Sequence, residues 1–101
     1  MKTLIATLIA KPEKSEALEQ VLRHLVERAR TETGCLAYHL HRIADRPNGF
    51  MFYEVWQSQE ILDEHMKMPY LSQFWEQRMD YLEQDVEIVF LDMLTEFPVK
   101  P

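Results

Sequence analysis

Cysteine and glycine are scarce in this chain, and long hydrophobic runs are missing from it. The single cysteine, Cys35, excludes a disulfide within the chain. No Cys-x-x-Cys pair and no glycine-rich phosphate loop occur, so the sequence indicates neither zinc nor a nucleotide cofactor. No apolar run approaches the roughly 20 residues that span a bilayer. These absences favour a protein without disulfides, zinc or membrane-spanning segments.

Positive charge is also in short supply. Lysine and arginine number 11 against 17 aspartates and glutamates, which gives a net charge of −6. This charge disfavours nucleic acid and anionic membranes as partners. The first ten residues, MKTLIATLIA, alternate with threonine and lead to Pro12 rather than to a cleavage site of small residues, so we interpret them as a strand and not as a signal peptide. The predicted location is cytoplasmic.

The residues that are present suffice for one core. The chain has 101 residues, of which 47% are hydrophobic and 28% are charged, so residues 1–101 are predicted to form a single globular domain. A domain of this size buries about 65% of the surface that its unfolded chain exposes. An apolar face that remains uncovered after folding would therefore indicate a partner subunit.

The first half of the chain shows one strand, one long helix and a hairpin. Residues 3–10 alternate as a strand that is apolar on both faces. Pro12 opens a helix with apolar residues at three- and four-residue spacing, and Gly34 is expected to end it. Strands at 35–43 and 50–57 flank a turn that contains Asn-Gly, which predicts a hairpin.

The second half predicts a broken helix and a last strand. Ser58 is a plausible N-cap for a helix over 59–67, and Pro69 begins a second helical segment that continues to Leu82. Residues 86–93 alternate as a strand that is again apolar on both faces.

This order of elements predicts an α+β fold of the ferredoxin-like βαββαβ kind, with a four-stranded antiparallel sheet. Helices can cover only one face of such a sheet. Because the first and last strands are apolar on both sides, the other face is expected to pack against a second copy of the chain. We predict a homodimer through the sheet faces.

Several segments carry a resemblance to a known family: Glu32–Tyr38, Tyr53–Ser58, and His65 followed by Met68–Tyr70 and Phe74. With these segments, and over nearly its whole length, the chain resembles the antibiotic biosynthesis monooxygenase (ABM) family of dimeric α/β barrels. The resemblance implies a pocket between sheet and helices, in which an electron-rich aromatic substrate is deprotonated and then reacts directly with oxygen. The family also contains haem-degrading enzymes and a sugar-phosphate isomerase of quorum-signal breakdown.

The predicted function is that of a cofactor-free monooxygenase that oxidises a quinol-like or polyphenolic aromatic, with no metal. His65 is the candidate base, because imidazole titrates near neutrality; the alternative is a helix-terminal histidine that interacts with the last carbonyls. Glu54 lies in an apolar strand, where a carboxylate is costly unless paired. It supports catalysis, pairs with Arg42 or Arg78, or holds the backbone in place. Tyr70 is a candidate donor to an anion or, alternatively, a packed residue.

The candidate substrate-binding residues are His41, Trp56, Phe52 and Phe74. Trp56 shares a strand face with Glu54 and either bounds an aromatic substrate or fills the core. His39 and His41 point to the same side of a strand, but no third ligand is fixed by the sequence, and we predict no metal site.

The alternative function is that of a non-oxygenase relative, either a small-metabolite binding protein or an isomerase of the quorum-signal type. A phosphosugar would require lysine or arginine in the pocket. The predicted pocket segments offer only Arg42, Lys67 and Arg78, which argues against this alternative.

Overall fold

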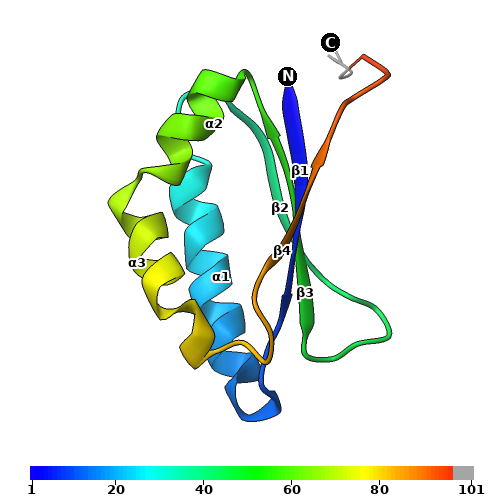
Figure 1. Cartoon of the computed structure of the whole chain (residues 1–101), viewed down its shortest axis with the longest axis vertical. Helices are drawn as coiled ribbons and strands as arrows, with labels where there is room; N and C mark the ends of the chain where they lie inside the picture. The colour runs from blue at the N-terminus through cyan, green and yellow to red at the C-terminus, as the bar shows by residue number, and fades with distance from the viewer. Residues whose placement is uncertain (97–101) are drawn as a thin grey trace.

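The computed structural model describes residues 1–96 as a two-layer α+β domain (Figure 1). Helices lie on one face of a four-stranded sheet, which confirms the predicted ferredoxin-like class. The elements, in chain order, are β1 (Lys2–Ile9), η1 (Pro12–Lys14), α1 (Ser15–Ala29), β2 (Cys35–Arg42), β3 (Gly49–Trp56), α2 (Gln59–Met66), α3 (Pro69–Gln77), η2 (Arg78–Asp80) and β4 (Glu87–Leu91).

All neighbouring strands of the sheet are antiparallel, in the order β2-β3-β1-β4. On β1, Leu4 lies opposite Glu54 of β3 on one side and opposite Phe90 of β4 on the other. Tyr38 of β2 also pairs with Glu54. Since side chains alternate along a strand, these residues share the face that the helices cover. Glu54 therefore lies in the middle of the sheet, on its covered face.

Helix α1 packs on this face through the apolar stripe that its sequence predicts. Leu18, Leu22, Leu25 and Ala29 recur every three or four residues and are buried. Their partners include Leu8, which is 2% exposed. Burial of such a stripe is what holds a helix on a sheet, at about 25 cal/mol for each Å² of apolar surface removed from water.

The connection from α1 to β2 differs from the prediction. The helix ends at Ala29, five residues before Gly34, and a tight turn follows in which the amide of Glu32 donates to the Ala29 carbonyl at 3.0 Å. Gly34 has a φ of 85° and stands directly before β2, so it ends the turn rather than the helix. Glu32 is thereby held in a short, well-bonded segment instead of a last helical turn.

Gly34→Ala is expected to lower the free energy of unfolding by about 1–3 kcal/mol. The left-handed conformation disfavours a side chain, and an added Cβ would lie only 2.8 Å from Cγ2 of Ile61 on α2. Urea denaturation measures the loss. A double-mutant cycle with Ile61→Ala separates the steric share from the backbone share. An alanine variant as stable as the parent chain would contradict this account of the turn.

The last strand is shorter than predicted, since β4 spans Glu87–Leu91 and pairs only with β1. Its two faces are apolar, as expected. Phe90 lies on the helix side, whereas Val89 pairs with Ile5 on the face that no helix of residues 1–96 covers, and Val89 is 45% exposed. Within residues 1–96, no helix is both long and apolar enough to cross a membrane.

Candidate active site

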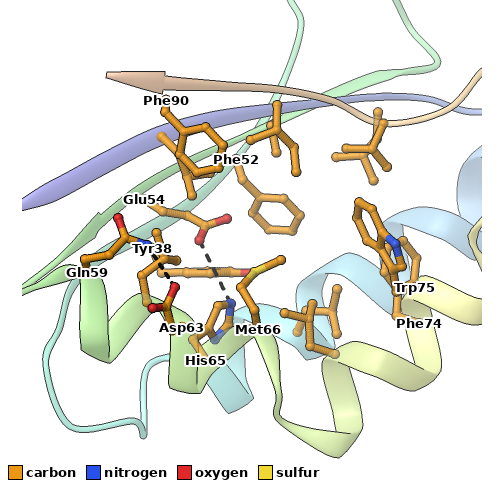
Figure 2. A pocket seen from close by; sticks show the side chains of 18 residues that line it. Tyr38, Phe52, Glu54, Gln59, Asp63, His65, Met66, Phe74, Trp75 and Phe90 are labelled. Atoms are coloured by element: carbon orange, nitrogen blue, oxygen red, sulfur yellow. Dashed lines mark hydrogen bonds and ion pairs between the residues drawn. The ribbon is translucent and has the colours of Figure 1, made fainter. Parts of the chain in front are cut away.

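A cavity of about 120 Å³ lies between the covered face of the sheet and helices α2 and α3 (Figure 2). Its walls are apolar and include Phe52 and Phe74. Two ionisable side chains, Glu54 and His65, face each other in it. Phe90 of β4 lines the cavity and is 69% exposed, so the cavity meets solvent beside β4. A buried acid–base pair in an apolar hollow is the arrangement that a proton-transfer site requires.

Glu54 extends from β3 into this cavity and is 5% exposed. Its Oε1 atom accepts a hydrogen bond of 2.9 Å from Nε1 of Trp56, two residues along the same strand face. Burial raises the pKa of Glu54 to about 7; the Trp56 hydrogen bond opposes this shift, and the nearby charge of Glu32 adds to it. Near neutral pH this carboxyl group is therefore able both to donate and to accept a proton.

The predicted pairing of Glu54 with Arg42 or Arg78 is wrong. Arg42 bonds to Glu19, and Arg78 donates to Asp85 at 2.7 Å. Both arginines reach partners at the surface, whereas Glu54 lies inside the domain on the covered face of the sheet. The indole of Trp56 takes the place of a counter-ion, which leaves the pKa of the carboxyl group raised instead of lowered.

His65 lies in the last turn of α2 and is 1% exposed. Its side chain points toward the sheet instead of toward the carbonyls at the helix end (Figure 2). The ring stacks on Trp56 with centroids 4.2 Å apart, and Nε2 lies 4.0 Å from Oε1 of Glu54. Burial lowers the pKa of His65, although its contact with Glu32 opposes the shift. The imidazole is thus neutral at physiological pH, with a lone pair available to accept a proton.

Helix α2 is short because residues at both of its ends favour the beginning and the end of a helix. The Ser58 hydroxyl caps the first turn by accepting from the amide of Ile61 at 3.2 Å, and Pro69 begins the next helix. Leu62 and His65, three residues apart, form the buried face of α2. The break between α2 and α3 thus places His65 in the last turn of α2, on the buried face of that helix.

Glu32 is a site residue to which the sequence alone assigned no role. Its Oε2 atom lies 2.8 Å from Nδ1 of His65 and also accepts a hydrogen bond from the Tyr70 hydroxyl of α3. The Glu32 side chain is 9% exposed. The only sequence signal for Glu32 is its position just before the Thr33-Gly34 turn. Glu32 and His65 are 33 positions apart in the chain, so no local pattern predicts their contact.

The remaining predicted site residues occupy different places. Phe52 and Phe74 line the cavity. Trp56 lies behind Glu54 and His65 instead of lining it, and Tyr70 lies on the side of His65 that faces Glu32. Their candidate roles therefore change from substrate contact to support of the acid–base pair.

His41 lies outside the cavity, because it pairs with Met51 on the face of the sheet opposite to Tyr38 and Glu54 and is exposed there. It cannot contact a molecule held between Glu54 and His65. His39 contacts Arg30, with Nδ1 3.1 Å from a guanidinium nitrogen. In the described part of the chain, no group of three or more histidine, cysteine, aspartate or glutamate side chains is arranged to hold a metal ion.

The fold and the site together define a class: a ferredoxin-like α+β domain with a histidine–glutamate pair in an apolar cavity. Residues 1–77 match the family model described as "Antibiotic biosynthesis monooxygenase". The chain belongs to the antibiotic biosynthesis monooxygenase family. This membership supports a monooxygenase-type role. A more specific function has to be argued from the residues of the site.

Relatives of known structure share the fold. PA3566 from Pseudomonas aeruginosa is 36% identical, with a TM-score of 0.87 over 93% of this chain and 94% of that chain. Rv0793 from Mycobacterium tuberculosis is 28% identical, with a TM-score of 0.89 over 94% of this chain and 96% of that chain. The uncharacterized protein sll1783 of Synechocystis sp. is 35% identical over 78 residues, which are 77% of this chain. This chain spans about half (53%) of the length of that curated relative.

Proposed function

We propose that the protein is a cofactor-free monooxygenase that oxidises a quinol-like or polyphenolic aromatic with molecular oxygen. One observation carries this proposal: His65 and Glu54 face each other across an apolar cavity, and both have proton-accepting atoms without a protein partner. Within residues 1–96, Nε2 of His65 makes no hydrogen bond and lies 4.0 Å from Oε1 of Glu54, and the second carboxyl oxygen of Glu54 makes no hydrogen bond. These atoms are free for a substrate.

The separation of the pair suits a substrate hydroxyl. Because Nε2 of His65 lies only 4.0 Å from the nearer carboxyl oxygen of Glu54, one substrate oxygen can lie within hydrogen-bond reach of both Nε2 and the Glu54 carboxyl group. His65 then accepts the hydroxyl proton, and the protonated form of Glu54 donates to the resulting oxyanion. The apolar walls, including Phe52 and Phe74, exclude water, so the electron-rich anion survives to meet oxygen.

The reaction balances without an added reductant when the substrate is a quinol. Oxygen adds to the ring carbon beside the deprotonated hydroxyl and forms a hydroperoxide after protonation. The O–O bond then breaks as the same carbon loses its proton, so that one oxygen atom stays as a carbonyl and the other leaves as water. Quinol and O₂ thus give hydroxyquinone and H₂O, and the quinol supplies all four electrons. This stoichiometry is what allows a site built only of side chains to perform the oxidation.

The size of the cavity favours a single aromatic ring. A cavity of about 150 Å³ is known to accommodate benzene, and the cavity here is about 120 Å³. A fused or substituted ring system would extend past Phe90 toward solvent. We therefore propose that the reacting ring lies between Glu54 and His65, with larger substituents at the opening.

A phosphosugar substrate fits the cavity less well. None of the described lining residues is a lysine or an arginine, and Glu54 and Asp63 add negative charge instead. A phosphate group in such a site would lack a counter-ion and a bidentate donor. The lining thus supports the aromatic substrate over the isomerase alternative.

The proposal is tested by oxygen uptake. Purified protein treated with a chelator is expected to consume oxygen in the presence of a single-ring quinol faster than the spontaneous rate. Since no metal takes part in the proposed chemistry, chelation should leave the excess unchanged. Uptake equal to that of the blank across single-ring and fused-ring quinols, or an excess that disappears with the chelator, would contradict the proposal.

We also propose that the protein is a homodimer through the face of the sheet that no helix covers. Ile5, Tyr53 and Val89 lie on this face. Sedimentation equilibrium is expected to give a mass of twice 12.1 kDa, and Val89→Glu is expected to shift the protein toward the monomer because it places a charge on the interface. A monomer at all concentrations would contradict this assembly.

A further inference from the structure

Three elements meet on the side of His65 that faces away from Glu54. Glu32 comes from the turn after α1, Tyr70 from α3 and His65 from α2. The Tyr70 hydroxyl donates to Oε2 of Glu32, and the same Oε2 atom lies 2.8 Å from Nδ1 of His65. Neither Glu32 nor Tyr70 lines the cavity, so neither side chain is placed to contact the substrate directly.

The contact between Glu32 and His65 decides which ring nitrogen carries the proton. Nδ1 lies within hydrogen-bond distance of a carboxylate oxygen, which only accepts, so Nδ1 must donate. Burial and Glu32 raise the pKa of Tyr70, so its hydroxyl keeps its proton and also donates to Glu32. A neutral imidazole has one N–H group. With this proton on Nδ1, the lone pair is on Nε2, the atom that faces Glu54.

We propose that Glu32 is a positioning residue, which fixes His65 in the Nδ1–H tautomer and thereby makes Nε2 the proton-accepting atom in the cavity. The catalytic consequence rests on the proposed function, but the tautomer does not. Glu32 also favours the charged imidazole that forms when Nε2 takes the substrate proton, since a carboxylate at 2.8 Å attracts it.

Tyr70 provides a distinctive test of the proposal. When Glu32 is removed, the Tyr70 hydroxyl is expected to donate a hydrogen bond to Nδ1 of His65, whereas Glu32 accepts one from it. Its hydroxyl oxygen is 3.3 Å from Nδ1 of His65. In Glu32→Ala the hydroxyl loses its acceptor and donates to Nδ1 instead. The ring proton then moves to Nε2, and the cavity faces an N–H group with no lone pair. Removal of one carboxylate is thus expected to invert the tautomer.

Nitrogen-15 NMR of the histidine rings in the whole protein tests the tautomer directly, above the pH at which His65 is charged. In the parent chain, Nδ1 of His65 is expected to show the shift of a protonated nitrogen and Nε2 that of an unprotonated one. Glu32→Ala should exchange the two, and Glu32→Gln should not, because its carbonyl oxygen still accepts from Nδ1. Glu64→Ala is the matched control, because Glu64 is an exposed glutamate on α2, the helix that carries His65. This substitution should leave both ring nitrogen shifts unchanged. An Nε2–H ring in the parent chain, or an unchanged tautomer in Glu32→Ala, would overturn the proposal.

The kinetic arm separates positioning from a merely structural role. In Glu32→Ala, kcat for quinol oxidation should fall at least about 100-fold with KM little changed, since the proton acceptor is lost while the cavity is not. Glu32→Gln should retain more of kcat than Glu32→Ala. Equal losses in both variants would overturn the tautomer argument. If no quinol is oxidised by any form but the ring shifts follow the expected pattern, the proposed function fails and the tautomer assignment stands.

Discussion

Replacing His65 by glutamine is expected to lower the rate of quinol oxidation by about 10²–10⁴-fold. The substitution removes the ring nitrogen that faces Glu54 at 4.0 Å and leaves the apolar walls in place. Glutamine is polar and of similar length, so it is able to keep a hydrogen bond to Glu32. The expected loss is therefore in proton transfer and appears in kcat.

Initial rates of oxygen consumption measure this effect. His24→Gln is the matched control, because His24 lies on α1 with a side chain that is 65% exposed, and its rate should equal that of the parent chain. Circular dichroism and a thermal melt check that the His65 variant is folded. A folded His65→Gln protein that retains the parent rate would show that the imidazole is not the base.

Glu54→Gln is expected to make the folded protein more stable at alkaline pH. Burial raises the pKa of Glu54 from an unfolded value of 4.5 to about 7, so the folded state binds its proton more tightly than the unfolded chain does. The stability that this provides is fully present below about pH 4.5 and is lost as the pH rises through about 7. An uncharged glutamine does not show this loss and still accepts from Trp56 through its carbonyl oxygen.

The gain in the free energy of unfolding at pH 8, relative to the difference between the two proteins at pH 4.5, should be on the order of 2–3 kcal/mol. Urea denaturation at both pH values measures it. The lowered pKa of His65 acts in the opposite sense, because its contribution is lost as the pH falls. That contribution is present in both proteins, so the comparison isolates Glu54. Glu60→Gln, an exposed change on α2, should give no such difference. If Glu54→Gln changed the free energy of unfolding by the same amount at both pH values, this result would contradict the buried position of Glu54.

The fold was predictable because its patterns are local. The helical spacing of Leu18, Leu22 and Leu25, and the alternation along β1, each depend on neighbours within one element. The position of His65 was partly predictable for the same reason. It lies three residues after Leu62 on the buried face of α2, and this spacing predicts a side chain that points inward.

The contacts of the site were not predictable, because they join residues that are far apart in the chain. A carboxylate inside an apolar strand indicated that Glu54 has a partner, but the sequence does not show which of many polar groups reaches it. The partner proved to be the indole of Trp56, two positions away, and not Arg42 or Arg78. The contact of Glu32 with His65 depends on the turn that follows α1, whose length the helical pattern does not fix.

Trp56 and Glu54 lie on the same face of β3, and this explains why the role of Trp56 in the structure differs from the predicted one. Trp56 was expected to bound a substrate because it lies on the same strand face as Glu54. In the structure this proximity makes Trp56 a hydrogen-bond donor to Glu54 and a stacking partner of His65, which leaves Phe52 and Phe74 as the aromatic walls. His41 lies on an edge strand, where nothing in its local sequence distinguishes a site residue from an exposed one.

The measurement that tests the central claim most directly is the fate of oxygen-18 during turnover of a single-ring quinol by chelator-treated protein. A monooxygenase that uses His65 and Glu54 for proton transfer is expected to place one labelled atom in the hydroxyquinone and the other in water. With His65→Gln, the labelled product should form about 10²–10⁴-fold more slowly. Label recovered in hydrogen peroxide, with an unlabelled quinone as the product, would show simple oxidation and contradict the account.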